Sequence, residues 1–386
     1  MSSRMVRSRF KAWHLAVVVA LVSTVFFAAT LLNTLTVPKS FYRIRSEVTY
    51  VNEGVHPWNL SKEDLTFYLF MNTTLQEVRL VDASHPISYK SVDEDGNSYL
   101  ILEADKLKIY PNENFTCLLE FNAVRPKKSV VTLDGEPGSL KDIPSSLKES
   151  FCVGNAVWQI DDCDLRRLAE TEAKSNIVLD IVLNYVKWIK SNIRYSFGQE
   201  TPMYPNETYR LRRGDCDDQA ILLITLCRIY GIPAYLQLGC IYDPTQPYRE
   251  LNLWGGHFIY EAERISWHGW AMVYIPPWGW LPVDLTFMED EPITAITDAA
   301  VNSEFLIVYM NVSNQDYVRE NRMLKSYLEK NNFKIVMHDS MELIETSGFP
   351  FTTDLNLQIQ GKLITSISSR RLYTPQILIN PINTEI

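Results

Sequence analysis

The chain has 386 residues, of which 46% are hydrophobic and 22% charged, and this composition is ordinary for globular domains. At roughly 100–200 residues per domain, the length suggests two folded domains and additional segments. The 37 basic and 46 acidic residues give a formal net charge of −9. Because nucleic-acid binding requires a positive surface, and the sequence has no long basic run, nucleic acid is not an expected partner.

Residues 1–37 differ in composition from the rest of the chain. Four basic residues lie within the first eleven, and the stretch from Ala12 to Val37 that follows contains no Asp, Glu, Lys or Arg. About 20 apolar residues suffice to cross a bilayer as a helix, and signal peptides usually have a shorter apolar region of about 7–15 residues. We therefore expect one uncleaved transmembrane anchor. A cleaved signal peptide, with Ala28-Ala29 near its cleavage site, is the alternative.

The residues around this stretch predict the orientation of the chain. Basic residues are slightly more frequent before it than after it, which favours a cytoplasmic N-terminus and an extracytoplasmic body, and so a single-pass membrane protein. Five Asn-x-Ser/Thr sequons would be usable only on an external body: Asn59, Asn72, Asn114, Asn206 and Asn311. An oxidising compartment would also permit a disulfide between Cys152 and Cys163, although two unrelated buried thiols fit the sequence equally well.

Residues 40–126 have the pattern of a β domain. Short runs of alternating apolar and polar residues are separated by turn signals such as Asp95-Gly96-Asn97. Strands at this spacing predict an antiparallel β-sandwich, which we interpret as a spacer or a recognition domain. Residues 127–150 contain Gly, Pro, Ser and Lys in a pattern typical of a linker. A second domain is expected over 151–298, followed by a C-terminal α/β extension over 299–386 without an assigned role.

Within the second domain, Cys216 is the candidate nucleophile. Asp215 is a suitable N-cap, and Gly231 followed by Pro233 ends the helix that begins after it. Cys216 therefore lies in the first helical turn, where free backbone N–H groups and the helix dipole favour a thiolate. Because the neighbouring aspartates oppose the thiolate, a base is still required. A small buried residue is the alternative interpretation, and it fits Cys227 and Cys240 better.

A predicted β-hairpin over residues 266–287 supplies the candidate base and its partner. Folding at the turn over 276–279 brings His268, in the first strand, close to Asp284, late in the second strand, because diagonal neighbours across strands lie roughly 7–8 Å apart. A carboxylate at that position would orient the imidazole. A register error of one residue would separate the two side chains. His257 is the alternative base.

Three segments of this region resemble the transglutaminase-like superfamily. The segment Gly214–Ala220 looks like the cysteine motif of that family, His268–Trp270 is similar to its histidine strand, and Trp280–Asp284 resembles its aspartate strand. The three occur in the family's order, and the resemblance covers about 161–286. It implies a papain-like α+β fold in which the cysteine helix packs on an antiparallel sheet. An upstream β-sandwich is also common among microbial members.

The resemblance implies acyl transfer at peptide or carboxamide bonds by a triad of Cys216, His268 and Asp284. The backbone N–H of Cys216 would hold the oxyanion, and Tyr204 and Tyr209 are candidates for a second donor. Release of the acyl group by water, as in a peptidase or amidase, and by an amine, as in cross-linking, use the same triad, so both stay open. Met272 and Leu285, where the family often has an acidic residue and Pro, leave the substrate open.

The expected partners are a peptide or protein substrate and, through the N-terminal helix, a membrane. We expect no cofactor and no metal site, since the sequence contains no calcium-loop motif and no Cys-x-x-Cys pair. The alternative function is a catalytically inactive surface module that uses the same fold to bind peptide or glycan. Its groove would be lined by tryptophans such as Trp254, Trp267 and Trp278, which fit a sheet core equally well.

Overall fold

The computed structural model describes residues 39–126, 131–155, 157–287 and 291–347, which form a mixed α+β fold. The Ala12–Val37 stretch expected to span a membrane lies outside these residues, as does 348–386. Among the described residues, no helix has the length and apolarity needed to cross a membrane. All six cysteines are free thiols, including Cys152 and Cys163.

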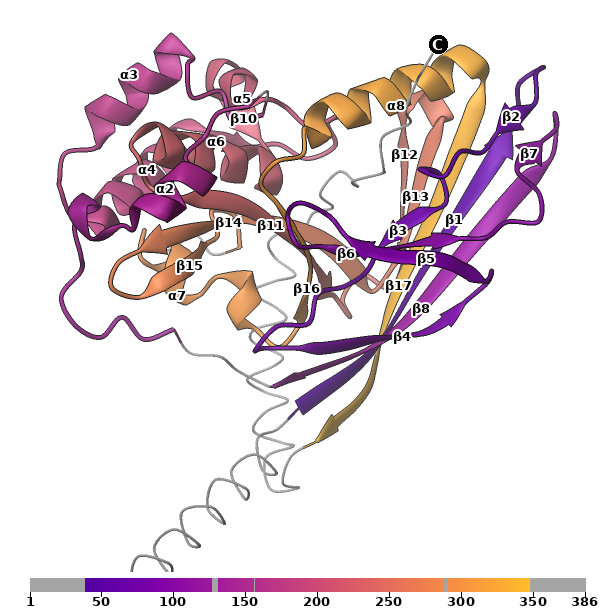
Figure 1. Ribbon diagram of the computed structural model, residues 1–386, viewed down its shortest axis with the longest axis horizontal. Coiled ribbons are helices and arrows are strands. Elements are labelled where there is room, and N and C mark those ends of the chain that lie inside the picture. The colour runs from indigo at the N-terminus through magenta and orange to yellow at the C-terminus, as the bar shows by residue number, and fades with distance from the viewer. Residues whose placement is uncertain (1–38, 127–130, 156, 288–290, 348–386) are drawn as a thin grey trace, which may run out of the picture.

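An antiparallel four-stranded sheet forms the base of the candidate site. Its strands occur in the order β15-β14-β11-β16, and they are β11 (Ala234–Tyr242), β14 (Ile265–Ile275), β15 (Gly279–Val283) and β16 (Leu306–Val312). A group of helices covers one face of this sheet (Figure 1). These helices are α2 (Ser145–Phe151), α3 (Cys163–Glu172), α4 (Val178–Asn192), α5 (Pro205–Leu211) and α6 (Cys216–Ile229).

Helix α6 is the centre of this layer. All but the last of its 14 residues are buried, which is the pattern of a helix surrounded by other elements rather than of a surface helix. In contrast, α4 buries one stripe at helical spacing, including Ile181, Tyr185 and Ile189. Gly231, at φ 75°, adopts the left-handed conformation just after α6 ends. The nucleophile candidate therefore begins the most enclosed helix of the described structure.

A six-stranded sheet combines distant parts of the chain. Its order is β12-β13-β17-β1-β8-β4, with bounds β1 (Lys39–Asn52), β4 (Glu77–Ala83), β8 (Asn114–Pro126), β12 (Arg249–Leu253), β13 (Phe258–Glu263) and β17 (Phe333–Ser347). Three strands come from the predicted β-sandwich segment, two from within 151–298 and one from the C-terminal extension. The pairing is antiparallel except between β13 and β17.

Smaller strands and helices complete the fold. A three-stranded sheet, ordered β3-β6-β5, and the pair β2–β7 accompany the six-stranded sheet, and β9 and β10 form a short parallel pair beside α5. The bounds are β2 (Trp58–Asn59), β3 (Thr66–Tyr68), β5 (Ile87–Val92), β6 (Ser98–Leu102), β7 (Lys108–Ile109), β9 (Arg194–Tyr195), β10 (Arg213–Gly214), α7 (Thr294–Thr297) and α8 (Tyr317–Asn331).

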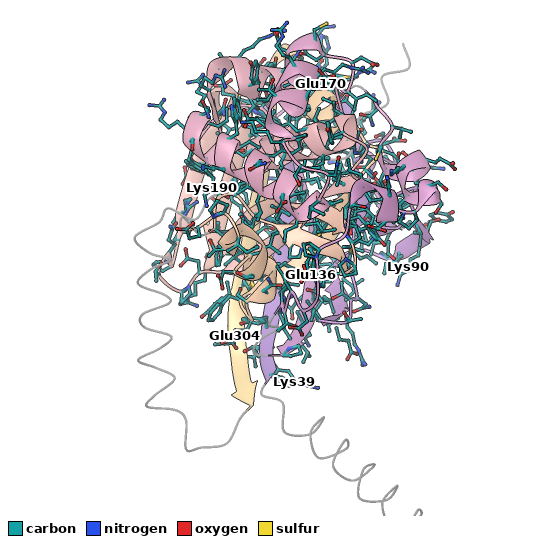
Figure 2. All side chains as sticks on the ribbon, turned by 90° about the vertical axis from the view of Figure 1, so that its left-hand side faces the viewer. Lys39, Lys90, Glu136, Glu170, Lys190 and Glu304 are labelled. Atoms are coloured by element: carbon teal, nitrogen blue, oxygen red, sulfur yellow. The ribbon has the colours of Figure 1, made fainter. Side chains whose placement is uncertain are left out.

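Two hydrophobic cores meet along α8 and β14. Tyr317, at the start of α8, packs in the core around α6, whereas Leu328, near its end, packs in the core beneath the six-stranded sheet. A hydrogen bond of 2.7 Å from Ser40 Oγ to Glu304 joins the start of β1 to the segment before β16, and Figure 2 shows Glu304 near Lys39 at that end of the molecule. The four-stranded sheet and its helices are thus continuous with the surrounding sheets.

Candidate active site

Cys216 is the first residue of α6, and its neighbours build the helix start. The Asp215 side chain accepts a hydrogen bond from the backbone N–H of Asp218, and Asp218 bonds back to the backbone N–H of Asp215, which forms a capping box. The predicted N-cap at Asp215 is therefore present. Cys216 is 2% exposed, so its thiol lies at the free N–H groups of the helix but away from bulk solvent.

Asp218 also fixes the loop that precedes α5. Its carboxylate accepts hydrogen bonds from the backbone N–H of Met203 at 2.8 Å and from Nε2 of Gln199 at 3.1 Å. Burial raises the pKa of Asp218 to about 8, and the Asp217 charge acts in the same direction, against the backbone donors of Met203 and Asp215. One side chain thus holds the 196–203 loop against the turn that carries Cys216.

His268 and Asp284 form the second half of the site. Ala271 on β14 pairs with Val283 on β15, so Asp284, the next residue, is diagonal to His268 on the same face. The separation between His268 Nε2 and Asp284 Oδ2 is 2.7 Å, and both residues are buried. This contact occupies Nε2 and leaves Nδ1 as the nitrogen for exchanging a proton with another group.

Backbone donors hold Asp284 in its charged form. Its Oδ2 accepts from the N–H of Ala300 at 3.1 Å, and its Oδ1 accepts from Thr286 and Phe287 at 3.2 Å each. Burial raises the pKa of this carboxyl, but the charge and hydrogen bond of His268 and the backbone donors outweigh burial, and the pKa is lowered. Asp284 is therefore suited to orient the ring and to stabilise its protonated form.

Gly269 connects the cysteine helix to the histidine strand. A Cβ atom built on Gly269 would lie 3.1 Å from Asp217 Cβ and 3.1 Å from Leu238 Cδ2, so the absence of a side chain lets the first turn of α6 approach β14 closely. The backbone N–H of Gly269 also faces the Cys216 thiol and lowers its pKa. The residue next to His268 is thus in direct contact with the turn that carries Cys216.

The thiol of Cys216 has a strongly raised pKa. Burial is the largest cause, the charges of Asp215, Asp217 and Asp284 add to it, and the Gly269 N–H opposes them. No hydrogen bond joins Sγ to the His268 ring among the contacts of the described residues. Catalytic hydrogen bonds are often longer in ligand-free sites and tighten when substrate binds. A base is therefore necessary for this thiol to act as a nucleophile near neutral pH.

A contact from the C-terminal extension reaches the same turn. The hydroxyl of Tyr317, at the start of α8, donates to Asp217 Oδ2 at 3.1 Å, and both residues are buried. Sequence reasoning did not identify Tyr317, because no local pattern links it to a residue one hundred positions earlier. Asp316 caps α8 by accepting a hydrogen bond from the backbone N–H of Arg319.

The other sequence candidates lie in different surroundings. His257 lies just before β13, and its Nδ1 is 2.8 Å from the backbone oxygen of Phe333, the first residue of β17. The Tyr204 hydroxyl donates to the Asp316 carboxylate, and the Tyr209 ring stacks on Trp188 with centroids 5.8 Å apart. The contacts of the two tyrosines thus differ from those expected of a second oxyanion donor.

Asp215, Cys216 and Asp217 are the one group in the described residues whose side-chain atoms lie close enough to one another to hold a metal, within 4.8 Å. The structure gives two of the three another role. Asp215 caps α6, and Asp217 accepts from Tyr317. The group is thus explained by the helix start, and the prediction of no metal remains open.

A cysteine at the start of a buried helix, packed on an antiparallel sheet with a His–Asp pair, is the arrangement expected of a papain-like α+β domain. Residues 166–285 match the sequence model of the transglutaminase-like superfamily, so the chain contains a transglutaminase-like domain, which indicates a cysteine-dependent enzyme. No curated protein matches the chain.

Two solved structures show a distant likeness to the chain. A putative cysteine protease from Cytophaga hutchinsonii is 18% identical, with a TM-score of 0.47 over 81% of this chain and 93% of that one. A putative protease from Parabacteroides distasonis is 10% identical, with a TM-score of 0.19 over 61% of this chain and 66% of that one.

Proposed function

We propose that the protein is a thiol acyl-transfer enzyme that acts on peptide or carboxamide bonds, with Cys216 as nucleophile, His268 as general base and Asp284 as the group that orients the base. The observation that carries the proposal is the buried His268–Asp284 contact of 2.7 Å. Gly269, the residue after His268 on β14, faces the Cys216 thiol. A nucleophile, a base and an orienting acid in this order form the general arrangement of such sites.

The chemistry begins with proton transfer from the Cys216 thiol to Nδ1 of His268. The thiolate then attacks the carbonyl carbon of the substrate, and the backbone N–H of Cys216 stabilises the oxyanion that forms. When the carbon–nitrogen bond breaks, the imidazolium returns its proton to the leaving amine, and a thioester on Cys216 remains. His268 next deprotonates a water molecule or an amine, which attacks the thioester and regenerates the free thiol.

The proposed substrate is a peptide or protein on the outer side of a membrane. The charge-free stretch Ala12–Val37 and the five sequons support an anchored extracytoplasmic body. Hydrolysis and transfer to an amine use the same residues. Incubation with a peptide substrate and a labelled primary amine separates the two, because transfer attaches the label to the substrate whereas hydrolysis yields a free acid.

The experiment that tests the triad measures the rate at which iodoacetamide alkylates each cysteine, read by mass spectrometry between pH 5 and 9. Exposed Cys163, which also begins a helix, is the reference for a solvent-accessible thiol, and Cys227 and Cys240 are the references for buried thiols. We expect Cys216 to react fastest. His268→Ala should slow Cys216 by about 10²–10⁴-fold, the usual contribution of a general base.

His257→Ala is the matched control, since His257 is hydrogen-bonded to Phe333 and is not assigned to the triad. It should leave the alkylation of Cys216 unchanged. The near-complete burial of Cys216 favours the second candidate, an inactive surface module that binds peptide or glycan. Slow alkylation of Cys216 that His268→Ala does not alter would support that module and reject the enzyme.

A further inference from the structure

A pocket of about 480 Å³ lies beside the turn that carries Cys216. It is formed by the 196–203 loop together with residues from α5, β10 and α8, and we call it the α5–α8 pocket. Its volume is within the range of roughly 300–1,000 Å³ that is usual for small-ligand sites. Pockets of this size accommodate a side chain or a chain end of a peptide.

Residues that line the pocket are hydrogen-bonded to the helical turn that carries Cys216. Gln199 and Met203, which line it, are the residues whose N–H groups bind Asp218 in the first turn of α6. Arg213, another lining residue, lies three positions before Cys216, in the β10 strand that leads into the helix. A ligand in this pocket would therefore contact the segments that position the nucleophile.

Acidic side chains in the pocket already have cationic partners. Glu200 forms an ion pair with Lys325, and Glu207 forms one with Arg322 at 2.6 Å. Both cations lie on α8, so the C-terminal extension neutralises the acids of this wall. Arg213 is different, because none of the ion pairs within the described residues involves it, although it is exposed and lines the same pocket.

Two further arginines neighbour Arg213 in the backbone, although neither lines the pocket. Arg194 on β9 is its register partner across the β9–β10 pair. The Arg212 guanidinium lies over the rings of Tyr209 and Trp188, at 4.4 Å and 4.9 Å from their centroids. All three arginines are exposed, and no ion pair between one of them and a carboxylate is found in the described part of the chain. Of the two cations that line the pocket, Arg322 is paired with Glu207 and Arg213 has no carboxylate partner in the described part of the chain, so Arg213 supplies positive charge to the pocket wall on a chain whose net charge is −9.

We propose that the α5–α8 pocket binds a carboxylate of the substrate peptide, either an Asp or Glu side chain or the C-terminal carboxylate, with Arg213 as its hydrogen-bonding partner. A guanidinium binds a carboxylate through two parallel N–H donors, which gives both affinity and orientation. The exposed side chains of Phe197 and Leu211, which also line the pocket, would cover the apolar part of the peptide. This inference rests on the proposed function, because the peptide is taken to be the substrate.

The test measures peptide binding by the full chain carrying Cys216→Ala, so that binding is observed without turnover. Three fluorescein-labelled hexapeptides are compared by anisotropy at low salt. One contains Glu and has an amidated C-terminus, the second has Gln in place of Glu with the same amide, and the third has Gln with a free C-terminal carboxylate. We expect one of the two carboxylate-containing peptides to bind about 3- to 10-fold more tightly than the neutral one, which identifies the source of the carboxylate.

The variants then locate the contact. Arg213→Gln should remove the preference for the carboxylate, and Arg213→Lys should retain part of it, because Lys keeps the charge but not the two-donor geometry. Arg79→Gln removes the same charge from exposed β4, away from the pocket, and should change nothing. Equal affinity for all three peptides would overturn the carboxylate site. So would an equal loss of the carboxylate preference in Arg213→Gln and Arg79→Gln.

The two proposals fail in different ways. If the carboxylate preference depends on Arg213 but Cys216 is not activated by His268, the pocket is a binding site on an inactive module and the proposed enzyme is rejected. If Cys216 is activated but the peptides bind equally, the enzyme stands and the carboxylate site is rejected.

Discussion

Tyr317 and Asp217 are joined across one hundred residues of sequence by a buried hydrogen bond of 3.1 Å. The other carboxylate oxygen of Asp217, Oδ1, is buried and lacks a hydrogen-bond partner among the described residues. Asp217 in turn lies against Gly269, next to His268. Tyr317 lies outside 166–285, the part that matches the transglutaminase-like superfamily. The C-terminal extension therefore helps to hold the turn on which Cys216 lies.

Replacing Tyr317 with Phe should loosen that turn without removing the ring from the core. The buried Asp217 carboxylate would lose its side-chain donor, which costs about 1–3 kcal/mol of unfolding free energy. Small displacements of reacting groups raise the activation barrier, so alkylation of Cys216 should slow by about 10-fold. Urea unfolding and the mass-spectrometric alkylation assay measure the two effects.

Tyr185→Phe is the matched control for Tyr317→Phe. Its hydroxyl donates to the backbone oxygen of Ala169 at 3.0 Å, between α4 and α3, so the variant also loses one buried hydrogen bond. It should lower stability and leave alkylation of Cys216 unchanged. If both variants slow alkylation equally, Tyr317 acts through global stability alone.

A side chain at Gly269 should disturb the contact between α6 and β14. In Gly269→Ala the new Cβ would lie 3.1 Å from Asp217 Cβ, a distance at which the neighbour must shift by a few tenths of an ångström. Overpacking of this kind costs about 1–3 kcal/mol, and we expect alkylation of Cys216 to fall with it. Thermal unfolding and alkylation rates are the measurements, and wild-type values for both would mean that the turn adjusts freely.

The arrangement of His268 and Asp284 was predictable because a hairpin is local. Strand alternation and one tight turn determine which residues share a face, and the N-cap at Asp215 follows from the residues beside it. The six-stranded sheet was not predictable in this way. Its β1 strand pairs with β17, with Lys39 opposite Ser347, and neither strand carries a local sign of its partner. The contact of Tyr317 with Asp217 was not predictable for the same reason, since the two residues are far apart in the sequence.

The position of the body relative to a membrane stays a prediction, because Ala12–Val37 lies outside the described residues. We expect protease added to intact cells to digest the body, detected with an antibody to an epitope at the C-terminus. A cytoplasmic protein in the same cells should remain intact, which controls for lysis. Full protection of the body in intact cells, with digestion after permeabilisation, would reverse the orientation.

Asp339, on β17, is a buried acid outside the candidate active site. Its Oδ2 accepts a hydrogen bond from Nε1 of Trp267 at 2.8 Å, whereas its Oδ1 lacks a partner in the described structure. Burial raises the pKa of this carboxyl to about 6, against the opposing effect of hydrogen bonds from Ser46 and Trp267. The folded protein therefore holds a proton on Asp339 at pH values where the unfolded chain has released it.

This difference predicts how stability depends on pH. An unfolded Asp titrates near 3.9, so between about pH 4 and 6 the folded state binds more protons than the unfolded state, and the unfolding free energy falls as the pH rises. The total loss is roughly 3 kcal/mol, and about half of it falls above pH 5.

Asp339→Asn, which cannot ionise, should therefore gain stability relative to the wild type as the pH increases from 5 to 8. Urea unfolding at the two pH values measures this gain, and Asp82→Asn, at an exposed position on β4, is the control that should show none. If Asp339→Asn and the wild type lose stability in parallel, Asp339 is ionised in the folded protein throughout this range.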